Sequence, residues 1–456
     1  MSMATLSSVS NVLAKTAGTR ADIALKTFPL WQLLKGKAGS GKLIGRSVNG
    51  KKTYYWSRPV PTSTGDNAGN IAETGTLAAY NASTADEALY SLLNTVSTIQ
   101  ISNLALNTGA INSSVDDDDV KIQEDGMMKD WRVKMMNGFM GQHQGWITSV
   151  REASTDLVVG VRDTDLFLIG QYINFYAFTA PSTWTKNTGP GTSGKCLISA
   201  VHPETDADMT GPHIHIAVNG STIAAGSFIT FDGQYNLANY GLGDGIQAGA
   251  DITCGNYTIT KALTTYANLS RSTYPDLVSL IYQPDGPGGV GAPSVARLFT
   301  WIAKIAAHQG EGKADIGLCF GHSHTITSVW EILAATRTLG LPSGGRIAYG
   351  ADLEPTINHP SLIKPVKFEG HIGAKKYCLT ALKLSDPEDF FVRDTDAPHY
   401  INKGDVNGIF SYDGFPGGGY HAWSAVFDYI WGMILNSRAH SMYAGISLPT
   451  EESVAS

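Results

Sequence analysis

Between residues 45 and 141, a long and mostly polar stretch with little apolar core of its own leads into a strongly patterned helical segment. Its near side, 51–56, is strand-like, but Pro59 and Pro61 then remove two amide donors. Strand-like character resumes on the far side and covers about 77–101. Two strands joined by a flexible tip are marginally stable at best in water. We therefore expect this extended loop either to fold back on its own domain or to lie on a neighbouring copy of the chain.

A long helix is predicted over about 115–142. Ser114 suits an N-cap, and the four aspartates at 116–119 give the first turn the charge that a helix N-terminus favours. One apolar stripe then recurs at helical spacing: Val120, Met127, Trp131, Met135 and Phe139. A solvated helix cap accounts for the aspartate run better than a divalent-cation site does.

From Trp146 to Gly233 the chain alternates with the period of two that is typical of strands, and it contains an internal repeat of 56 residues. The segment 158–175 aligns without gaps on 214–231, so that Gly170 matches Gly226. Two such units predict a small barrel or sandwich inserted into the chain. Chance similarity between two ordinary hairpins is the alternative.

Helical periodicity returns after Thr258. Ser294 is placed to cap a helix that Gly310 ends, and the apolar run 316–320 reads as a buried strand. A second helix over about 325–339 and two strand-like runs, 366–372 and 377–384, follow. This order predicts an α+β layer domain.

Composition narrows the class of protein. The chain has 456 residues, 43% of them apolar, and 50 glycines, which fits a folded protein with many turns and β connections. A net charge of −7 with 33 basic residues argues against a dedicated nucleic-acid binder. The four cysteines are widely spaced without a CxxC pair, so we expect buried free thiols. Neither a signal-peptide pattern nor a membrane-length apolar run occurs, which favours a cytoplasmic protein.

Candidate chemistry is sparse. Gly36–Lys42 has the GxxxxGK spacing of a phosphate-binding loop, but Leu43 replaces the magnesium-binding hydroxyl and no apolar strand precedes it. The pairs His213/His215 and His322/His324 each lack a third ligand that sequence places nearby, and zinc needs three or four. GxSxG and HExxH are absent. We therefore expect no catalytic, cofactor-binding or metal-binding residues, no cofactor and no enzyme activity.

The order of these parts resembles the major capsid protein of a tailed bacteriophage, with the Hong Kong 97-like fold that herpesvirus shells and encapsulin compartments also use. Locally, 267–275 before an apolar strand and 293–295 opening a helix are similar to segments of such coat proteins. The resemblance implies these parts: an N-terminal arm (1–45), an extended loop (46–93), a peripheral domain with the spine helix (94–145), an inserted β domain (146–233), a return to the peripheral domain (234–261), an axial domain (262–395) and a C-terminal segment (396–456).

The resemblance also implies a function: pentamers and hexamers of the chain form an icosahedral shell that encloses the DNA genome. Expected partners are the chain itself, a scaffolding protein, a portal protein, a decoration protein and packaged DNA held nonspecifically, with no membrane. Assembly would take place in the host cytoplasm, and the protein would reside in the virion. Tyr54, Tyr55 and Trp56 are candidate interface anchors on the loop, and packing on the subunit's own domain is their alternative.

Two rival hypotheses remain open at this stage. One is an encapsulin-like compartment shell protein of the same fold. The other is a β-rich phage tail protein that binds carbohydrate or depends on a metal held by the paired histidines.

Overall fold

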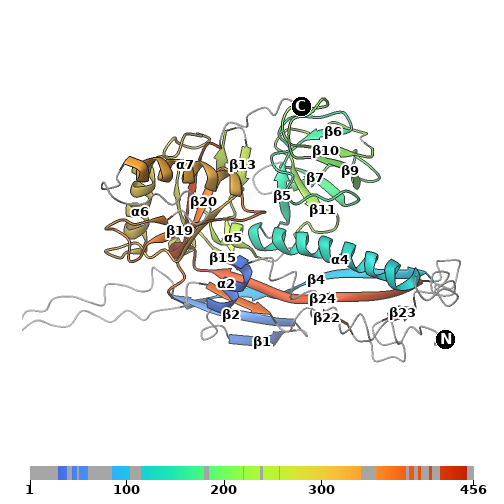
Figure 1. Cartoon of the computed structure of the whole chain (residues 1–456). Coiled ribbons are helices and arrows are strands. Elements are labelled where there is room, and N and C mark those ends of the chain that lie inside the picture. The colour runs from blue at the N-terminus through green and yellow to red at the C-terminus, as the bar shows by residue number, and fades with distance from the viewer. Residues whose placement is uncertain are drawn as a thin grey trace, which may run out of the picture.

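A computed structural model of the chain describes residues 29–37, 44–48, 51–59, 85–102, 115–142, 144–178, 184–218, 220–236, 240–255, 257–339, 356–386, 390–394, 399–401, 410–412 and 422–448. Within these ranges the chain is an α+β protein with many strands and few helices, as the sequence predicts (Figure 1). It consists of a peripheral layer, a barrel, an axial layer and a projecting sheet. In Figure 1 the barrel lies above helix α4, and the axial layer stands beside it.

The peripheral layer is built around β24 (Ala422–Leu435), a strand of 14 residues. One side of β24 pairs antiparallel with β4 (Leu93–Ser102), and α4 (Val115–Met140) lies along this sheet (Figure 1). The other side pairs with three short strands: β21 (Phe390–Asp394), β22 (His399–Tyr400) and β23 (Phe410–Tyr412). The central strand of this layer therefore comes from the segment 396–456, to which the sequence assigned no structure.

Helix α4 confirms the predicted long helix, since it covers 115–140 against an expected 115–142. Met127, Trp131, Met135 and Phe139 are buried as predicted, and the side chain of Val120 lies outside the described residues. Trp131 packs edge-on against two aromatic rings of β24, with centroids 5.4 Å and 5.9 Å away: Phe427 and Tyr429. The stripe is thus the face that α4 turns toward the sheet.

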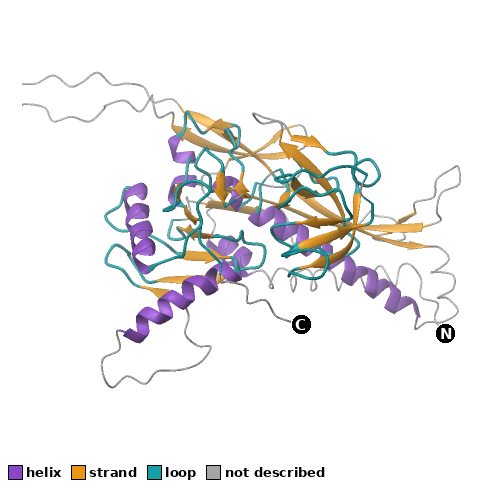
Figure 2. Cartoon of the chain, turned by 90° about the horizontal axis from the view of Figure 1, so that it is seen from above, coloured by secondary structure: helices purple, strands orange, loops and turns teal. Residues whose placement is uncertain are grey.

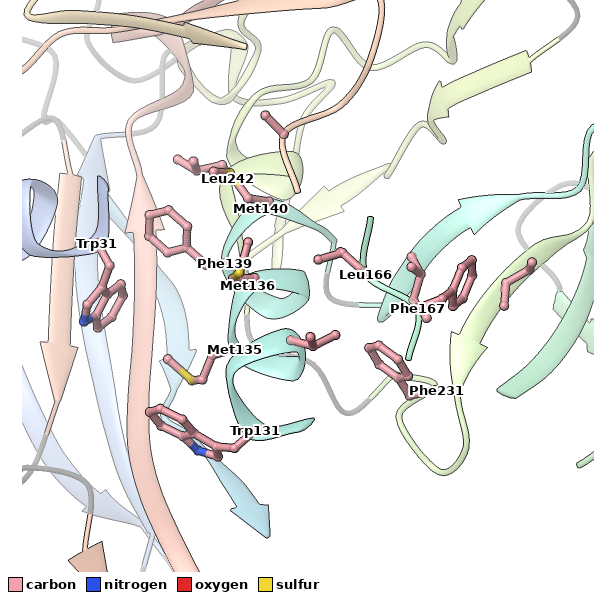
Figure 3. Packing of buried hydrophobic residues seen from close by; sticks show 14 of the residues in the cluster. Trp31, Trp131, Met135, Met136, Phe139, Met140, Leu166, Phe167, Phe231 and Leu242 are labelled. Carbon is pink, nitrogen blue, oxygen red and sulfur yellow. The ribbon is translucent and has the colours of Figure 1, made fainter. Parts of the chain in front are cut away.

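A second face of α4 is also apolar, and the single predicted stripe was incomplete. Met128, Met136 and Met140 are buried as well. Figure 3 shows Leu166 and Phe167 of the barrel on the side of α4 opposite Trp31. The helix is apolar on two faces because it lies between two layers and has little contact with water in its C-terminal half.

Helix α2 (Pro29–Lys37) belongs to the predicted N-terminal arm, yet it is anchored on the peripheral layer. Trp31 is fully buried, and its ring lies edge-on 5.4 Å from that of Phe139 and 5.1 Å from that of Trp431. Leu30 and Leu34 are buried on the same face. This part of the arm is therefore part of the subunit core.

The projecting sheet contains β1 (Ile44–Val48), β2 (Lys51–Pro59) and β3 (Ala85–Ser91), in that order and antiparallel. Thr53 lies opposite Ser91 and Pro59 opposite Ala85. The predicted loop therefore has both its strands, and β1 adds a third that the sequence did not indicate. The loop tip, 60–84, lies outside the described residues and includes the predicted start of the far side at Leu77.

Seven strands form the sheet of the barrel, which occupies the predicted inserted segment: β5 (Trp146–Ser149), β6 (Val158–Gly160), β7 (Tyr172–Phe178), β8 (Trp184–Lys186), β9 (Cys196–His202), β10 (His213–Ile216) and β11 (Phe228–Phe231). Their order is β5-β11-β7-β9-β10-β6, with β8 beside β7. An antiparallel bridge between Val150 and Val161 joins the two ends of this order. The sheet is thereby closed on itself, which leaves few unpaired edges.

The internal repeat has matching geometry in its two copies. In the alignment, β6 corresponds to β10 and β7 to β11, and each strand pairs with its counterpart. The aligned turn glycines, Gly170 and Gly226, both have left-handed backbones, with φ of 90° and 78°. Their N–H groups donate to the carbonyls of Ile198 and Val150 respectively. A glycine is favoured at both places because other residues are strained at positive φ.

The axial layer is a six-stranded sheet with the order β16-β25-β20-β17-β19-β18. Its strands are β16 (Leu280–Tyr282), β17 (Leu318–Gly321), β18 (Thr356–Ile357), β19 (Val366–Gly370), β20 (Cys378–Leu382) and β25 (Ser441–Ala444). Two helices, α6 (Val295–Gln309) and α7 (Ser323–Leu339), pack into one apolar cluster with it. Neighbouring residues of β17 enter different clusters, since Cys319 faces the helices whereas Leu318 and Phe320 join the core shared with α4.

The predicted limits of α6 are confirmed. The Ser294 hydroxyl accepts a hydrogen bond from the amide of Arg297, and Gly310 ends the helix with φ of 74°. Short elements connect the layers: α5 (Leu242–Gly245), β12 (Ile252–Cys254), β13 (Tyr257–Thr260), β14 (Thr265–Tyr266), β15 (Leu269–Ser270), and the 3-10 turns η2 (Pro275–Leu277) and η3 (Ser437–Ala439). Figure 2 shows the layers from above, with helices and strands in separate colours.

Candidate functional site

The root of the projecting sheet is fixed to the body of the same chain. Ala88 on β3 is 1% exposed and belongs to a small apolar cluster with Tyr266, Tyr274 and Ile434. The Tyr274 hydroxyl donates a hydrogen bond to the carboxylate of Asp86, two residues before Ala88. Burial and this carboxylate raise the pKa of Tyr274 to about 12, so the hydroxyl remains a donor at physiological pH. The position of β3 is therefore set at one point by packing and by a hydrogen bond.

Beyond this root, the structure describes the pairing of the strands but not their side chains. Strand β2 lies in the middle, between β1 and β3, and carries the predicted anchors at residues 54–56. Their backbones are placed opposite β1 and β3, with Tyr54 facing Gly45 and Tyr90. Their side chains lie outside the described residues, so their role as anchors stays a prediction.

The first histidine pair acquires a third histidine. His213 and His215 lie on β10, and His202 lies directly opposite His213 on the neighbouring strand β9. One ring nitrogen from each of the three lies within 4.8 Å of the other two. The sequence spacing of eleven residues between His202 and His213 signals this contact only once β9 and β10 are known to form a hairpin.

The second histidine pair does not act as a pair. His322, just after β17, lies with Nε2 2.7 Å from a carboxylate oxygen of Asp165, which comes from the barrel. A carboxylate oxygen of Asp163, two residues before Asp165, lies 3.7 Å from the ammonium nitrogen of Lys376. His324 is exposed, its backbone amide donates a hydrogen bond to Nδ1 of His322, and the two rings lie edge-on with centroids 5.0 Å apart. The result is a charged contact between the barrel and the axial layer.

The two carboxyl groups of this contact differ in acidity. Burial raises the pKa of Asp163 above its ordinary value, although Lys376 acts in the opposite sense. Burial would also raise the pKa of Asp165, but the hydrogen bond from His322 and the positive charge nearby outweigh it and lower that pKa. Although Asp163, Asp165 and His322 are close enough to hold a metal, Lys376 already supplies a positive charge, so we interpret them as an ion-pair network.

The remaining sequence candidates are the glycine-rich segment 36–42 and the four cysteines. Gly36 and Lys37 are the last residues of α2, whereas a phosphate-binding loop precedes a helix, and 38–43 lie outside the described residues. All four cysteines are free and buried, as predicted. Burial raises the pKa of Cys196 to about 11 and that of Cys254 to about 12, which keeps these thiols protonated and unreactive. None of the helices in the described part of the chain is long and apolar enough to cross a membrane.

No protein-family model and no curated protein matches this sequence. Among solved structures, the chain is similar to the Cyanophage A-1(L) capsid asymmetric unit, with 13% identity, a TM-score of 0.45 and coverage of 92% of both chains. The capsid of Cyanophage P-SCSP1u matches with 10% identity, a TM-score of 0.34 and coverage of 90% of both chains. A holo-SrpI encapsulin complex from Synechococcus elongatus PCC 7942 matches over 37% of this chain and 53% of its own, with 10% identity and a TM-score of 0.21.

The structures matched over most of the chain are thus phage capsids, the same class of protein that the order of sequence elements resembles.

Proposed function

We propose that this chain is the major capsid protein of a tailed bacteriophage, with the Hong Kong 97-like fold. In this proposal its copies form pentamers and hexamers, which close into an icosahedral shell around the DNA genome. The division into arm, extended loop, peripheral, inserted and axial domains is part of the same proposal.

The observation that carries the proposal is the projecting sheet. Its middle strand, β2, has nine residues, and β1 adds an outer edge that pairs with no other described strand. Among the described side chains of this sheet, that of Ala88 at its root joins an apolar cluster of the body. A strand sheet of this kind buries little apolar surface by itself, and its free edge is a template for a further chain. A neighbouring subunit would supply the missing contact.

Head-to-tail contact explains how such subunits would form a closed shell. When the projecting sheet of one copy lies on the body of the next, the two surfaces in contact differ, and a rotation that closes generates a ring. Each contact can be weak, because the ring and its neighbours raise the effective concentration of the remaining contacts. The net charge of −7 suits a wall that confines DNA without binding it tightly.

The proposal includes partners that the fold of one subunit does not determine. A scaffolding protein would guide the curvature of the shell, a portal protein would occupy one vertex, and a decoration protein would bind outside. Packaged DNA would meet the inner wall nonspecifically. The virion is the expected location, after assembly in the host cytoplasm.

Replacement of the loop tip tests the proposal. We expect a variant with residues 60–80 replaced by a short Gly-Ser linker to remain soluble as monomers or small rings and to form no closed shells in electron microscopy. The wild-type chain, expressed alone or with its scaffolding protein, is expected to form shells of uniform size. Normal shells from the tip variant would contradict the role of the loop.

A folding control separates loss of assembly from loss of the subunit. The exposed Val218 lies on the barrel, far along the chain from the loop, and Val218→Ser should leave both folding and shells unchanged. The tip variant tests the role of the loop only if its circular dichroism and its cooperative unfolding are those of a folded subunit. Packaged nucleic acid in particles isolated from lysate, rather than enclosed protein, would distinguish a capsid from an encapsulin-like compartment.

A further inference from the structure

The three clustered histidines of the barrel have an acidic neighbour that the sequence analysis did not associate with them. Asp206 lies in the loop between β9 and β10, and its carboxylate sits between two of the rings. One oxygen lies 2.7 Å from Nδ1 of His202, and the other lies 3.2 Å from Nε2 of His213. Backbone amides of Asp208 and Met209 donate to this carboxylate, which fixes its orientation.

The tautomer of His213 follows from its surroundings. The side chain is 0% exposed, and Nδ1 lies 2.9 Å from the carbonyl oxygen of Gly211. Because a carbonyl only accepts hydrogen bonds, Nδ1 must carry a proton. In the neutral ring, Nε2 is then a bare lone pair. That atom is buried, has no hydrogen-bond partner and is directed toward Asp206.

A buried lone pair facing a carboxylate is unfavourable unless a proton on Nε2 or a metal ion lies between them, and the two further histidines beside it favour the metal ion. The same arrangement is common in metal sites, where a histidine donates one ring N–H to a backbone carbonyl and binds the metal through the other nitrogen. The rings of His202 and His213 are stacked with centroids 4.7 Å apart, and that of His215 is 4.8 Å from His202. The three imidazoles are therefore grouped, with the Asp206 carboxylate beside His202 and His213, while Nε2 of His215 lies 3.4 Å from a carboxylate oxygen of Asp208.

We propose that His202, His213, His215 and Asp206 bind one divalent transition-metal ion, with zinc as the expected occupant. Imidazole nitrogens with a carboxylate oxygen are ligands that suit zinc, in a tetrahedral arrangement whose nitrogens lie about 3.3 Å apart. The present separations of up to 4.8 Å require the rings to move inward. His202 and His215 have room to do so because they are partly exposed, at 36% and 24%, whereas the buried His213 holds the fixed position.

Four protein ligands define a structural site rather than a catalytic one, because no coordination position is left for a substrate. Three ligands come from the paired strands and the fourth from the connecting loop, 203–212. The ion would therefore fasten this loop to the barrel. Gly211 in the same loop has φ of 79° and donates its amide to the hydroxyl of Thr205, so the loop backbone already has the turn that brings Asp206 over the rings.

Metal content of the untagged full-length chain tests this inference. After incubation with zinc chloride and removal of free metal by gel filtration, we expect about one zinc per chain by mass spectrometry of the metal. Cobalt in place of zinc should give the intense visible absorption of a tetrahedral site. Zinc should also raise the melting temperature relative to protein treated with a chelator.

The variants leave the buried His213 in place so that the barrel can still fold. The double variant His202→Asn, His215→Asn removes two ligands, and its affinity for zinc should fall more than about 100-fold. His359→Asn, in the axial layer, is the matched control and should retain one zinc per chain. The inference is overturned if the wild type retains no stoichiometric zinc, or if the double variant, folded by circular dichroism, retains as much as the control. It is also overturned if binding is lost in His322→Asn instead, because the ion would then belong to the Asp163–Asp165–His322 cluster.

Discussion

Asp165 shows how a single residue contributes where two layers of the molecule meet. Its carboxylate comes from the barrel and accepts a hydrogen bond from His322 of the axial layer, at 2.7 Å. A hydrogen bond to a charged group stabilises a folded protein by about 1.5–3 kcal/mol. The contact therefore matters for how the barrel and the axial layer hold together.

We predict that Asp165→Asn lowers the free energy of unfolding by about 1.5–3 kcal/mol near pH 7. Because the pKa of Asp165 is lowered in the folded state, its stabilisation is present above the unfolded-state value, about 3.9, and is lost as pH falls through the folded-state value. The difference in unfolding free energy between wild type and Asp165→Asn should therefore be independent of the ionisation of Asp165 from about pH 5 upward. It should shrink below about pH 4. Urea unfolding between pH 3 and pH 7, on the monomer fraction of the loop-tip variant, measures this difference.

Asp163→Asn is the matched control for this prediction. The pKa of Asp163 is raised mainly by burial, so ionisation of this carboxyl group opposes folding and its contribution to stability has the opposite sign. Asparagine keeps the oxygen that accepts the amide of Asp165. We expect a smaller loss than for Asp165→Asn, and an equal loss would contradict the assigned roles.

At the scale of elements, α2 depends on one aromatic side chain. Trp31 is surrounded by the rings of Phe139, Tyr429 and Trp431. We predict that Trp31→Ala destabilises the subunit by about 3–5 kcal/mol, since it removes a large, fully buried side chain from between α4 and β24. Leu33→Ala, on the exposed side of the same helix at 36% exposure, should change stability far less. Guanidinium unfolding compares the two variants.

Elements with local signals could be predicted from the sequence. Ser294 and Gly310 mark both ends of α6, and the long helix α4 was found from its cap and its apolar spacing. What remained hidden depends on distant partners. Strand β24 was missed because its central place depends on pairing with the distant β4, where Trp431 donates a hydrogen bond to Thr95, 336 positions away. The second apolar face of α4 was missed for the same reason, since only the barrel explains it.

The candidate sites also depend on residues that are distant in the sequence. His213 and His215 were visible as a pair, but His202 and Asp206 join them only through a hairpin and its loop. His322 of the axial layer contacts Asp165 of the barrel, and their separation in the sequence gives no indication of this contact. The residues that cap a helix lie within four positions of one another, whereas the residues of these clusters come from different strands and loops.

At the scale of the whole molecule, the barrel has the properties of a separate unit. Its first and last strands lie side by side, with Thr230 opposite Trp146, so the chain enters and leaves at one place. We predict that the excised segment 144–236 folds alone and unfolds in one cooperative thermal transition by circular dichroism. Its Leu166 and Phe167, which face α4 in the full chain, would be exposed, and serine at both positions should improve its solubility without loss of the transition. A segment without cooperative unfolding would contradict the domain assignment.

The position of β24 and β25 after the barrel has a consequence for folding during synthesis on the ribosome. Both layers that flank the barrel stay incomplete until these two strands have been made, because β24 is the centre of one sheet and β25 pairs in the other. The barrel is therefore able to form while the neighbouring sheets still lack a strand, and the apolar faces of those sheets are covered last.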